Sequence, residues 1–394
     1  MINILRAYQQ NYLNNMKINY KRYFHNIVDF DNKLIGIIGA RGVGKTIFLL
    51  QYLKESPFEF HQKLYFSADV IDIDSIFDIA YEFHKVGGKL LIIDEIHKYN
   101  NFEIELKKIY DMLDLKVIFS GSSAIKLDNS KGDLSRRAIM YNMNGLSFRE
   151  FIELKEGIEL PYFTLEDILN NHINISATIL SQIKPYQYWN EYLKYGFYPF
   201  YFENQNSYPI RLKETINTVI EVDIPSIFKI EYEKIINLKK LVRLVCQSKP
   251  FEINIRELSS KIGIGDYQTL YKYLEYLKRG KILNILKPLS KGDNIFSKPD
   301  KIYLSNPNLH FSYCNNSEIG TIREVFFASQ FHEDRLHSIK RGDFLLDGKY
   351  TFEIGGKNKG FKQIKDIENS YVVRDDIEIG DKNILPLWLF GFLY

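Results

Sequence analysis

The chain has 394 residues, of which 45% are hydrophobic and 26% are charged, and its formal net charge is +3. This length predicts two or three domains, and this composition excludes disordered and collagen-like chains. The mildly basic balance neither requires nor excludes a nucleic-acid partner. Cys246 and Cys314 lie far apart and form no CxxC motif, so we expect no zinc ribbon and no disulfide framework. This cysteine usage fits a reducing cytosol, and no signal peptide or membrane-spanning run is visible, so we expect a cytoplasmic protein without a membrane partner.

The first part of the chain alternates apolar strands with helices. The predicted elements are, in chain order, strand 34–38, helix 45–54, strands 63–67 and 89–94, helix 102–113, and strands 116–120 and 137–143. Continuous apolar strands between helices are typical of a parallel sheet that is covered on both faces. The first part is therefore predicted to be an α/β domain.

A glycine-rich loop follows the first predicted strand and opens the first predicted helix. Its sequence, GARGVGKT, matches the GxxxxGK[ST] pattern of phosphate loops in the context that the pattern requires. Glycines let backbone N–H groups curl around phosphates, and the helix N-terminus adds positive potential. We expect Lys45 to reach the β- and γ-phosphates of ATP and Thr46 to bind Mg²⁺. The predicted nucleotide-binding residues are Gly39, Ala40, Arg41, Gly42, Val43, Gly44, Lys45, Thr46 and Ile47.

Two acids follow the third predicted strand, which reads LLIIDE at residues 90–95. This is the Walker B pattern, in which we expect Asp94 to hold Mg²⁺ through water and Glu95 to polarise the attacking water. Adjacent carboxylates after a buried strand rarely serve packing, because a buried unpaired charge is costly. The alternative for Glu95 is a cap on the following helix. His97 completes a DExH sequence, but no second RecA-like domain or arginine-rich helicase motif follows, so we expect a supporting or surface role for His97.

Polar and basic residues lie near the last two predicted strands of this part. Ser120 and Ser122 end the fourth strand, where a hydroxyl can contact the γ-phosphate or the attacking water; a serine-rich turn is the alternative. Arg136 and Arg137 precede the fifth strand. An arginine can stabilise charge on a transferred phosphoryl group, in cis or from a neighbouring subunit, and a solvated surface pair is the alternative. The predicted catalytic residues are Glu95, Lys45, Ser120 and Arg137, and the predicted metal ligands are Thr46 and Asp94.

The rest of the chain is predicted to form three further parts. Residues 147–245 are mostly helical and are interpreted as a lid and connector. Residues 246–310 show a helix, a Gly-Ile-Gly turn, a second helix and two strands, which is the winged-helix arrangement. Residues 311–394 begin with a helix, and strands follow near 343–346, 350–354, 371–373 and 385–390. The apolar run 384–394 is expected to be a buried terminal strand.

Several runs of the sequence resemble one protein family. The runs GARGVGKT, LLIIDEIHKYNNFEIELKKIYD, IFSGSSAIKL, KGDLSRRA and GLSFREF look like those of prokaryotic AAA-superfamily ATPases with a C-terminal restriction-nuclease-like domain of unknown function. VIEVDIP, KIYLSNPNL, IREVFF, FEIGGKNK and LPLWLFGFLY are similar to the same family, so the likeness covers nearly the whole chain. The resemblance implies an α/β fold with a P-loop NTPase sheet at 1–146, a helical lid at 147–245, a winged helix at 246–310 and an α+β nuclease-like domain at 311–394.

The predicted winged helix has two possible partners. Its second helix carries Gln268, Lys272, Lys278 and Arg279, and its wing carries Lys287, Lys291 and Lys298, which could contact DNA phosphates. Glu275 interrupts that face, and the tyrosines Tyr267, Tyr271, Tyr273 and Tyr276 could serve protein contacts instead. Both interpretations remain open.

The tail carries acids at the spacing of a metal-dependent nuclease. Asp343 and Glu353 lie on neighbouring predicted strands, and Glu324 on the preceding helix is a candidate outer acid. Nucleases of the PD-(D/E)xK type place a lysine two residues after the second acid, where this chain has Gly355. Lys357 is a candidate substitute. We expect a degenerate domain that binds DNA or protein and cleaves DNA weakly or not at all.

These observations predict an ATP- and Mg²⁺-dependent ATPase whose nucleotide state controls the winged helix and the tail. ATP and ADP are the expected ligands, DNA is a candidate partner, and the oligomeric state is open. Two alternatives are an ATP-regulated nuclease and a nucleotide-gated binding module with negligible turnover.

Overall fold

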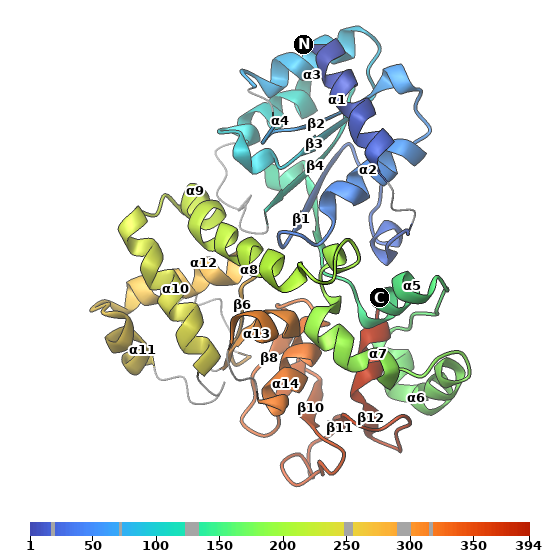
Figure 1. Ribbon diagram of the computed structural model, residues 1–394, viewed down its shortest axis with the longest axis vertical. Helices are drawn as coiled ribbons and strands as arrows, with labels where there is room; N and C mark the ends of the chain where they lie inside the picture. The colour runs from blue at the N-terminus through green and yellow to red at the C-terminus, as the bar shows by residue number, and fades with distance from the viewer. Residues whose placement is uncertain (17–19, 71–72, 123–133, 248–254, 290–300, 315–317) are drawn as a thin grey trace. The chain divides into compact units, whose positions relative to one another are not determined.

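The structure is a computed structural model that describes residues 1–16, 20–70, 73–122, 134–247, 255–289, 301–314 and 318–394 (Figure 1). The chain divides into two compact units, Met1–Gly145 and Leu146–Tyr394, and each is described by itself. The finer division of the second unit into a lid, a winged helix and a nuclease-like tail stays a prediction.

The first unit contains a parallel sheet of five strands in the order β2-β3-β4-β1-β5. The strands are β1 (Leu34–Gly39), β2 (Lys63–Ser67), β3 (Leu90–Asp94), β4 (Lys116–Ser122) and β5 (Ile139–Met143). The helices are α1 (Ile2–Asn15), α2 (Lys45–Glu55), α3 (Ile76–Lys85) and α4 (Phe102–Met112), with short turns at Tyr23–Asn26, Phe60–Gln62, Ile96–Lys98 and Leu134–Arg136. The predicted strands and helices of this unit are therefore confirmed to within two residues.

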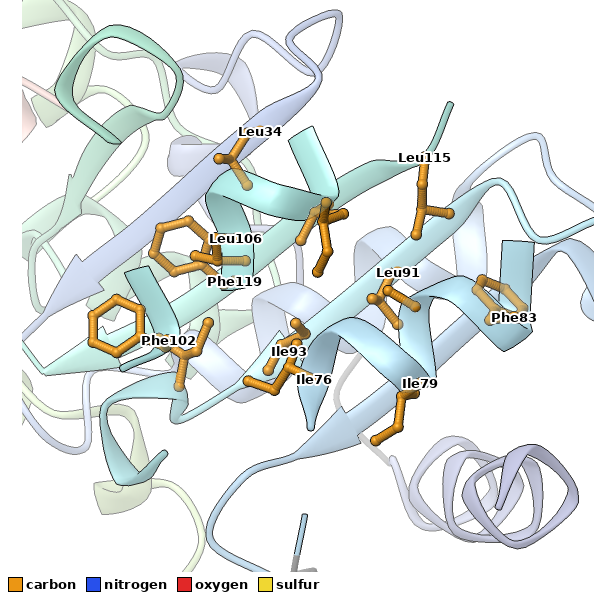
Figure 2. Packing of buried hydrophobic residues seen from close by; sticks show 14 of the residues in the cluster. Leu34, Ile76, Ile79, Phe83, Leu91, Ile93, Phe102, Leu106, Leu115 and Phe119 are labelled. Carbon is orange, nitrogen blue, oxygen red and sulfur yellow. The ribbon is translucent and has the colours of Figure 1, made fainter. Parts of the chain in front are cut away.

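One apolar cluster joins the sheet to α3 and α4. Figure 2 shows Ile76 and Phe83 of α3 and Leu106 of α4 packed against Leu91 of β3 and Phe119 of β4. Alternate residues of each strand face this cluster because successive strand side chains point to opposite faces. Full burial of such a side chain contributes about 1.5–3 kcal/mol, so the cluster fixes the sheet on which the site residues are mounted.

The second unit begins with helices and ends in a mixed sheet. Its helices are α5 (Phe148–Glu156), α6 (Leu165–Leu180), α7 (Tyr186–Glu191), α8 (Tyr208–Thr218), α9 (Ile224–Phe228), α10 (Tyr232–Gln247), α11 (Ile255–Ile262), α12 (Tyr267–Arg279), α13 (Pro307–Tyr313) and α14 (Ile319–Ser329). Two π-helical turns, Tyr192–Gly196 and Val219–Asp223, and a 3-10 turn, Pro199–Tyr201, connect some of them.

The second unit contains two sheets, one formed between α12 and α13 in chain order and one formed after α14. Strands β6 (Leu283–Leu286) and β7 (Lys301–Leu304) form an antiparallel pair after α11 and α12, so the elements expected of a winged helix are present in the expected order. The second sheet has the order β12-β11-β10-β9-β8 and is antiparallel from β8 to β10 and parallel from β10 to β12. Its strands are β8 (Leu336–His337), β9 (Phe344–Leu346), β10 (Tyr350–Gly355), β11 (Ser370–Arg374) and β12 (Ile384–Pro386).

An aromatic cluster packs α14 on the mixed sheet. The Phe327 ring of α14 lies 5.3 Å from Phe344 of β9, 5.0 Å from Phe352 of β10 and 4.8 Å from Phe390, measured between ring centroids. This packing orients α14 over β10 and holds Glu324, one turn earlier on the helix, near the same strands.

The expectation of a long terminal strand is wrong. Strand β12 ends at Pro386, and Leu387–Phe392 form a buried 3-10 helix. Proline has no backbone N–H to donate to the sheet, and the following apolar residues are buried by helical packing rather than by strand pairing. An apolar run of this length does not by itself distinguish a buried strand from a buried helix.

The expectation that the cysteines stay apart is also wrong. Cys246, at the end of α10, and Cys314, directly after α13, form a disulfide across 68 residues of sequence. Sequence distance does not predict spatial distance when helices pack side by side. The argument for a reducing compartment that rested on these cysteines therefore no longer holds.

Replacing Cys314 by serine should destabilise the second unit. Opening a bridge that closes a loop of 68 residues costs about 4 kcal/mol if the stabilisation comes from lost entropy of the unfolded chain. Urea unfolding of the wild type and Cys314→Ser under oxidising conditions measures this difference. A reducing agent should bring the wild type to the level of the variant, and equal stability of the two proteins without reductant would contradict the bridge.

Candidate functional site

The phosphate loop connects β1 to α2 with a backbone that requires glycine at two positions. Gly42 and Gly44 have φ angles of 85° and 101°, in the left-handed region that side chains disfavour. A Cβ at Gly39 would lie 2.5 Å from the carbonyl oxygen of Met143, so this position also excludes larger residues. Gly44 is the N-cap of α2, and the N-terminus of that helix therefore opens toward the loop without a capping side chain.

Lys45 is held at this loop by backbone oxygens. Its ammonium donates to the carbonyls of Gly39 and Ala40, each at 3.1 Å, and the residue is buried. In this position the Lys45 ammonium can leave the two neutral carbonyls and bind phosphate oxygens instead. Hydrogen bonds to the charged phosphate oxygens are stronger. The expected role of Lys45 is thus compatible with its position.

Hydroxyl groups from three elements converge on the Asp94 carboxylate at the end of β3. Thr46 Oγ1 of α2 donates to Asp94 Oδ2 at 2.6 Å, and the Tyr65 hydroxyl of β2 donates to the same oxygen at 3.1 Å. Ser120 of β4 donates to Asp94 Oδ1. These donors satisfy a buried carboxylate, and they place the predicted metal ligands Thr46 and Asp94 in direct contact.

Glu95 is positioned by the same network. Its backbone N–H donates to Ser120 Oγ at 3.1 Å, and its φ of 51° turns the chain away from β3. The side chain retains 22% of its exposure, so the carboxylate lies at the edge of the site rather than within the sheet. The sequence-based alternative, that Glu95 caps the next helix, agrees with its N-cap position before Ile96–Lys98, but its side chain makes no capping hydrogen bond there.

Three residues that are not among the predicted catalytic, nucleotide-binding or metal-binding residues support the site. The Arg22 guanidinium donates to the carbonyl of Val43 at 3.0 Å and to that of Gly145 at 2.7 Å, so it braces the phosphate loop. Burial and the Asp94 charge raise the pKa of Tyr65, which keeps its hydroxyl a donor. The side chain of His97 is buried, and its Nδ1 lies 3.4 Å from Glu95 Oε2 and 3.3 Å from the Ser122 amide nitrogen. The DExH sequence was the one signal for His97, and no motif indicated Arg22 or Tyr65.

The structure does not bring Arg137 to the phosphate loop of its own chain. Arg137 precedes β5, whose first residue, Ile139, pairs with Ile35 near the start of β1. The phosphate loop follows the other end of β1, so Arg137 lies at the opposite edge of the parallel sheet. There it forms an ion pair with Asp111 at 2.9 Å. The expected cis role of Arg137 is therefore wrong.

A magnesium ion fits the oxygen donors at this edge of the sheet. Thr46 and Asp94 supply a hydroxyl and a carboxylate, the hard ligands that Mg²⁺ prefers, and Mg²⁺ commonly adds waters and nucleotide phosphates to one or two carboxylates. Within the described ranges, no group of three or more His, Cys, Asp or Glu side chains could hold a metal ion. A cation here would thus depend on the phosphates of a nucleotide.

The expected DNA-contacting face of α12 is largely neutralised. Lys278 pairs with Glu333 at 3.4 Å, and Arg279 pairs with Glu275 at 2.7 Å. The tyrosines of α12 do not form one exposed face. Tyr276 stacks on Phe228, and Tyr273 is buried, whereas Tyr267 is exposed. Of the cations predicted in the wing, Lys291 and Lys298 lie outside the described residues.

The structure brings the predicted tail acids together with two lysines. We call Glu324 of α14, Asp343 before β9, Glu353 of β10, Lys301 of β7 and Lys359 the tail cluster. The Lys301 ammonium lies 3.5 Å from Glu324 Oε2 and 3.3 Å from Asp343 Oδ1, and the Lys359 ammonium lies 2.5 Å from Glu353 Oε1. Burial, and then the Asp343 charge, raise the pKa of Glu324 and of Glu353.

Lys357, the lysine expected to replace the one missing at Gly355, is exposed and does not belong to the tail cluster. Lys359 occupies that place instead. Burial acts to lower the pKa of Lys359, but the Glu353 carboxylate outweighs it, and the pKa of the ammonium is raised. Lys359 therefore remains a cation beside Glu353.

The strand order and the position of the two motifs define the class of the first unit. A parallel sheet with the phosphate loop after β1, the acids after β3, and β4 between these strands is the fold of P-loop NTPases. Residues 31–152, which contain this site, match the family described as an AAA domain, and this match supports nucleotide binding. Residues 186–316 match a domain of unknown function, DUF8612, and neither description names a nuclease.

Relatives and solved structures show similarity along much of the chain. An uncharacterized protein of Methanocaldococcus jannaschii is 26% identical over 411 residues, which cover 93% of this chain and 86% of that protein. The Walker-type ATPase of Pyrococcus abyssi has a TM-score of 0.39 and 12% identity over 77% of this chain and 94% of that one. AMPPCP-bound DnaA of Aquifex aeolicus has a TM-score of 0.25 and 18% identity, and the match covers 70% of this chain and 87% of that one. No helix in the described part of the chain combines the length and apolar character that a membrane span requires.

Proposed function

We propose that the protein is a Mg²⁺-dependent ATPase and that its nucleotide state controls the second unit. The observation that carries the proposal is the contact of Thr46, Asp94 and Ser120 beside the phosphate loop, with Glu95 attached to the same network. Three separate elements, α2, the end of β3 and β4, supply these groups, which packing alone would not require. The direct test is phosphate release from ATP by the purified chain with and without Mg²⁺.

The residues of the site divide the work of hydrolysis. Lys45 moves its ammonium from the Gly39 and Ala40 carbonyls to the β- and γ-phosphates and neutralises their charge. Mg²⁺, held by Thr46 and Asp94, would supply further charge neutralisation. Glu95 orients the attacking water and accepts its proton, while Ser120 fixes the backbone of Glu95. Arg22 keeps the loop in shape through the Val43 carbonyl.

Replacing Arg22 by methionine should weaken ATP binding about tenfold, which corresponds to about 1.4 kcal/mol. The substitution retains an unbranched apolar stem but removes the guanidinium donors to the carbonyls of Val43 and Gly145. Isothermal titration with ATP measures the effect. Arg137→Ala is the matched control, because that arginine pairs with Asp111 at the opposite edge of the sheet, and it should bind ATP as the wild type does. Equal losses in the two variants would contradict the assignment of Arg22.

The control of the second unit by nucleotide is the finer part of the proposal. We propose that residues 246–310 act as a winged helix and that DNA is a candidate partner of the second unit. The exposed Lys272 and Gln268 remain available on α12, whereas its other basic residues are paired within the unit. Phosphate release measured with and without duplex DNA, at two salt concentrations, tests this part separately from ATP hydrolysis.

A further inference from the structure

The Cys246–Cys314 bridge ties together the two ends of one segment of the second unit. Cys246 lies in the last turn of α10, and Cys314 directly follows α13. Residues 247–313, which we call the bridged segment, contain α11, α12, β6, β7 and α13. Opening the bridge would remove the covalent tie between these ends and leave the chain itself intact. The chemical state of the bridge can therefore change the freedom of the bridged segment.

The bridge is partly open to a reagent. Cys246 and Cys314 are both half-buried, and Gln247, which follows Cys246, is exposed. Exchange between a thiol and a disulfide depends on the access of the attacking thiolate to a sulfur. The partial exposure of this bridge permits that access, whereas enclosure in a core would prevent it.

A buried histidine lies beside one of the two sulfurs. His310 is one turn before Cys314, 4% of its surface is exposed, and its Nδ1 lies 3.6 Å from Cys314 Sγ. Burial lowers the pKa of His310 to about 4, so the imidazole is neutral near neutral pH and carries a single ring proton. Within the described part of the protein its Nε2 has no hydrogen-bond partner. The proton is therefore assigned to Nδ1, where it can be donated to sulfur, because at Nε2 it would be buried without an acceptor.

This histidine makes the two sulfurs unequal as leaving groups. Both cysteines lie at the C-terminal end of a helix, where carbonyl dipoles disfavour a thiolate. Cys314 has a compensating donor, since a hydrogen bond from His310 Nδ1–H to sulfur becomes stronger when the sulfur carries a negative charge. A sulfur whose thiolate is stabilised is released faster in exchange. The contact therefore favours attack on Cys246 Sγ and release of Cys314 as a thiolate.

Charged residues beside the bridge also favour a thiolate. Burial raises the pKa of Tyr313, the residue before Cys314; Lys239 and Arg243 of α10 act against that rise, and Glu221 adds to it. Glu221 is paired with Lys239, so these three groups carry one net positive charge, that of Arg243. A positive charge nearby stabilises a thiolate on either sulfur of the bridge.

We propose that the Cys246–Cys314 bridge is a thiol–disulfide exchange site for a dithiol reductant, that His310 makes Cys314 its leaving thiolate, and that the bridge switches the bridged segment between a tied and an untied state. A bridge that served stability alone would require no donor beside one of its sulfurs. The proposal concerns the second unit and does not depend on ATP hydrolysis.

The exchange balances with the dithiol as the only co-reactant. A thiolate of the reductant bonds to Cys246 Sγ, the bond between the two cysteine sulfurs breaks, and the electron pair leaves on Cys314 Sγ. The second thiolate of the reductant then bonds to the reductant sulfur that is attached to Cys246, and Cys246 leaves as a thiolate. The reductant is oxidised to a disulfide, the bridge is reduced by two electrons, and the two protons of the dithiol pass through solvent to the cysteines.

The first test locates the attacked sulfur in the full oxidised chain without denaturant. Reduced glutathione, a monothiol, should convert the bridge to a mixed disulfide and one thiol, which iodoacetamide then alkylates. Peptide mass spectrometry locates the two groups. In the wild type, glutathione should lie on Cys246 in about tenfold excess over Cys314, with the alkyl group on Cys314. An equal distribution, or an excess on Cys314, would overturn the role of His310.

Variants of His310 separate its chemistry from its packing. His310→Phe occupies a similar space without a donor; it should lose the preference for Cys246 and slow the opening of the bridge by dithiothreitol about tenfold. His310→Asn places an amide near the position of Nδ1 and should retain most of both properties. Ser312→Ala is the matched control, since residues two positions apart on a helix do not share a face, and it should behave as the wild type does. Equal slowing in Ser312→Ala and His310→Phe would contradict the proposal.

The second test measures what the bridge controls. Backbone hydrogen exchange in α11 and α12 should be at least about tenfold faster after reduction by dithiothreitol, because the ends of the bridged segment are no longer tied. Exchange in α3 of the first unit should not change, and oxidised dithiothreitol should restore the slow rates. The switch is refuted if the bridge stays closed in dithiothreitol without denaturant, if α11 and α12 exchange equally in both states, or if reoxidation does not restore the bridge.

Discussion

Lys45→Ala is expected to abolish detectable ATP binding and turnover. The Lys45 ammonium is expected to contact the β- and γ-phosphates, and in the structure it is held by the carbonyls of Gly39 and Ala40. Its loss removes a charge contact to the phosphates that backbone N–H groups, the N-terminus of α2 and Mg²⁺ do not replace. Isothermal titration with ATP and an assay of phosphate release measure the two effects.

A control for Lys45→Ala must leave the loop intact. Lys54→Ala changes a lysine in the last turn of the same helix, outside the loop, and should bind and hydrolyse ATP as the wild type does. Circular dichroism should show that both variants are folded. Unchanged ATP affinity and rate in Lys45→Ala would exclude this loop as the nucleotide site.

Glu95→Gln is expected to bind ATP with wild-type affinity and to hydrolyse it at least about 10²-fold more slowly, as for the loss of a general base. The amide has the size of the carboxylate and can still form hydrogen bonds, but it cannot accept the proton of the attacking water. The backbone bond from Glu95 to Ser120 does not involve the side chain, so the network around Asp94 should persist. Quench-flow analysis should find the bound nucleotide as ATP rather than ADP.

The matched comparison for Glu95→Gln is Glu103→Gln, which removes an acid from the first turn of α4 and not from the end of β3. That variant should hydrolyse ATP at the wild-type rate. If Glu95→Gln also hydrolyses ATP at the wild-type rate, Glu95 is not the general base. Its role would then be limited to shaping the chain before the Ile96–Lys98 turn.

The fold of the first unit could be predicted because its signals are local. Apolar runs of five or six residues between turn-forming loops indicated each strand, and the phosphate loop fixed the junction of β1 and α2. Lys45, Thr46, Asp94, Glu95 and Ser120 lie together because all are at or just after the carboxyl ends of parallel strands. The same reasoning could have excluded Arg137, which precedes its strand and must lie at the other edge.

Contacts between distant segments could not be predicted from one sequence. Arg22 and Tyr65 carry no motif, and their roles depend on where Val43 and Asp94 lie after folding. The Cys246–Cys314 bridge depends on the packing of α10 near α13. The sequence did not predict the contact of Lys359 with Glu353, because the nuclease pattern places its lysine two residues after the acid. The side chain of Lys359 passes over Gly355 and reaches Glu353 from six residues further along the chain.

Phosphate release from ATP by the purified wild-type chain tests the central claim most directly. We predict steady release that requires Mg²⁺, stops with a chelator and is absent in Lys45→Ala. Tight ATP binding by the wild type without release above the Lys45→Ala background would contradict the claim. It would instead support a nucleotide-gated module with negligible turnover.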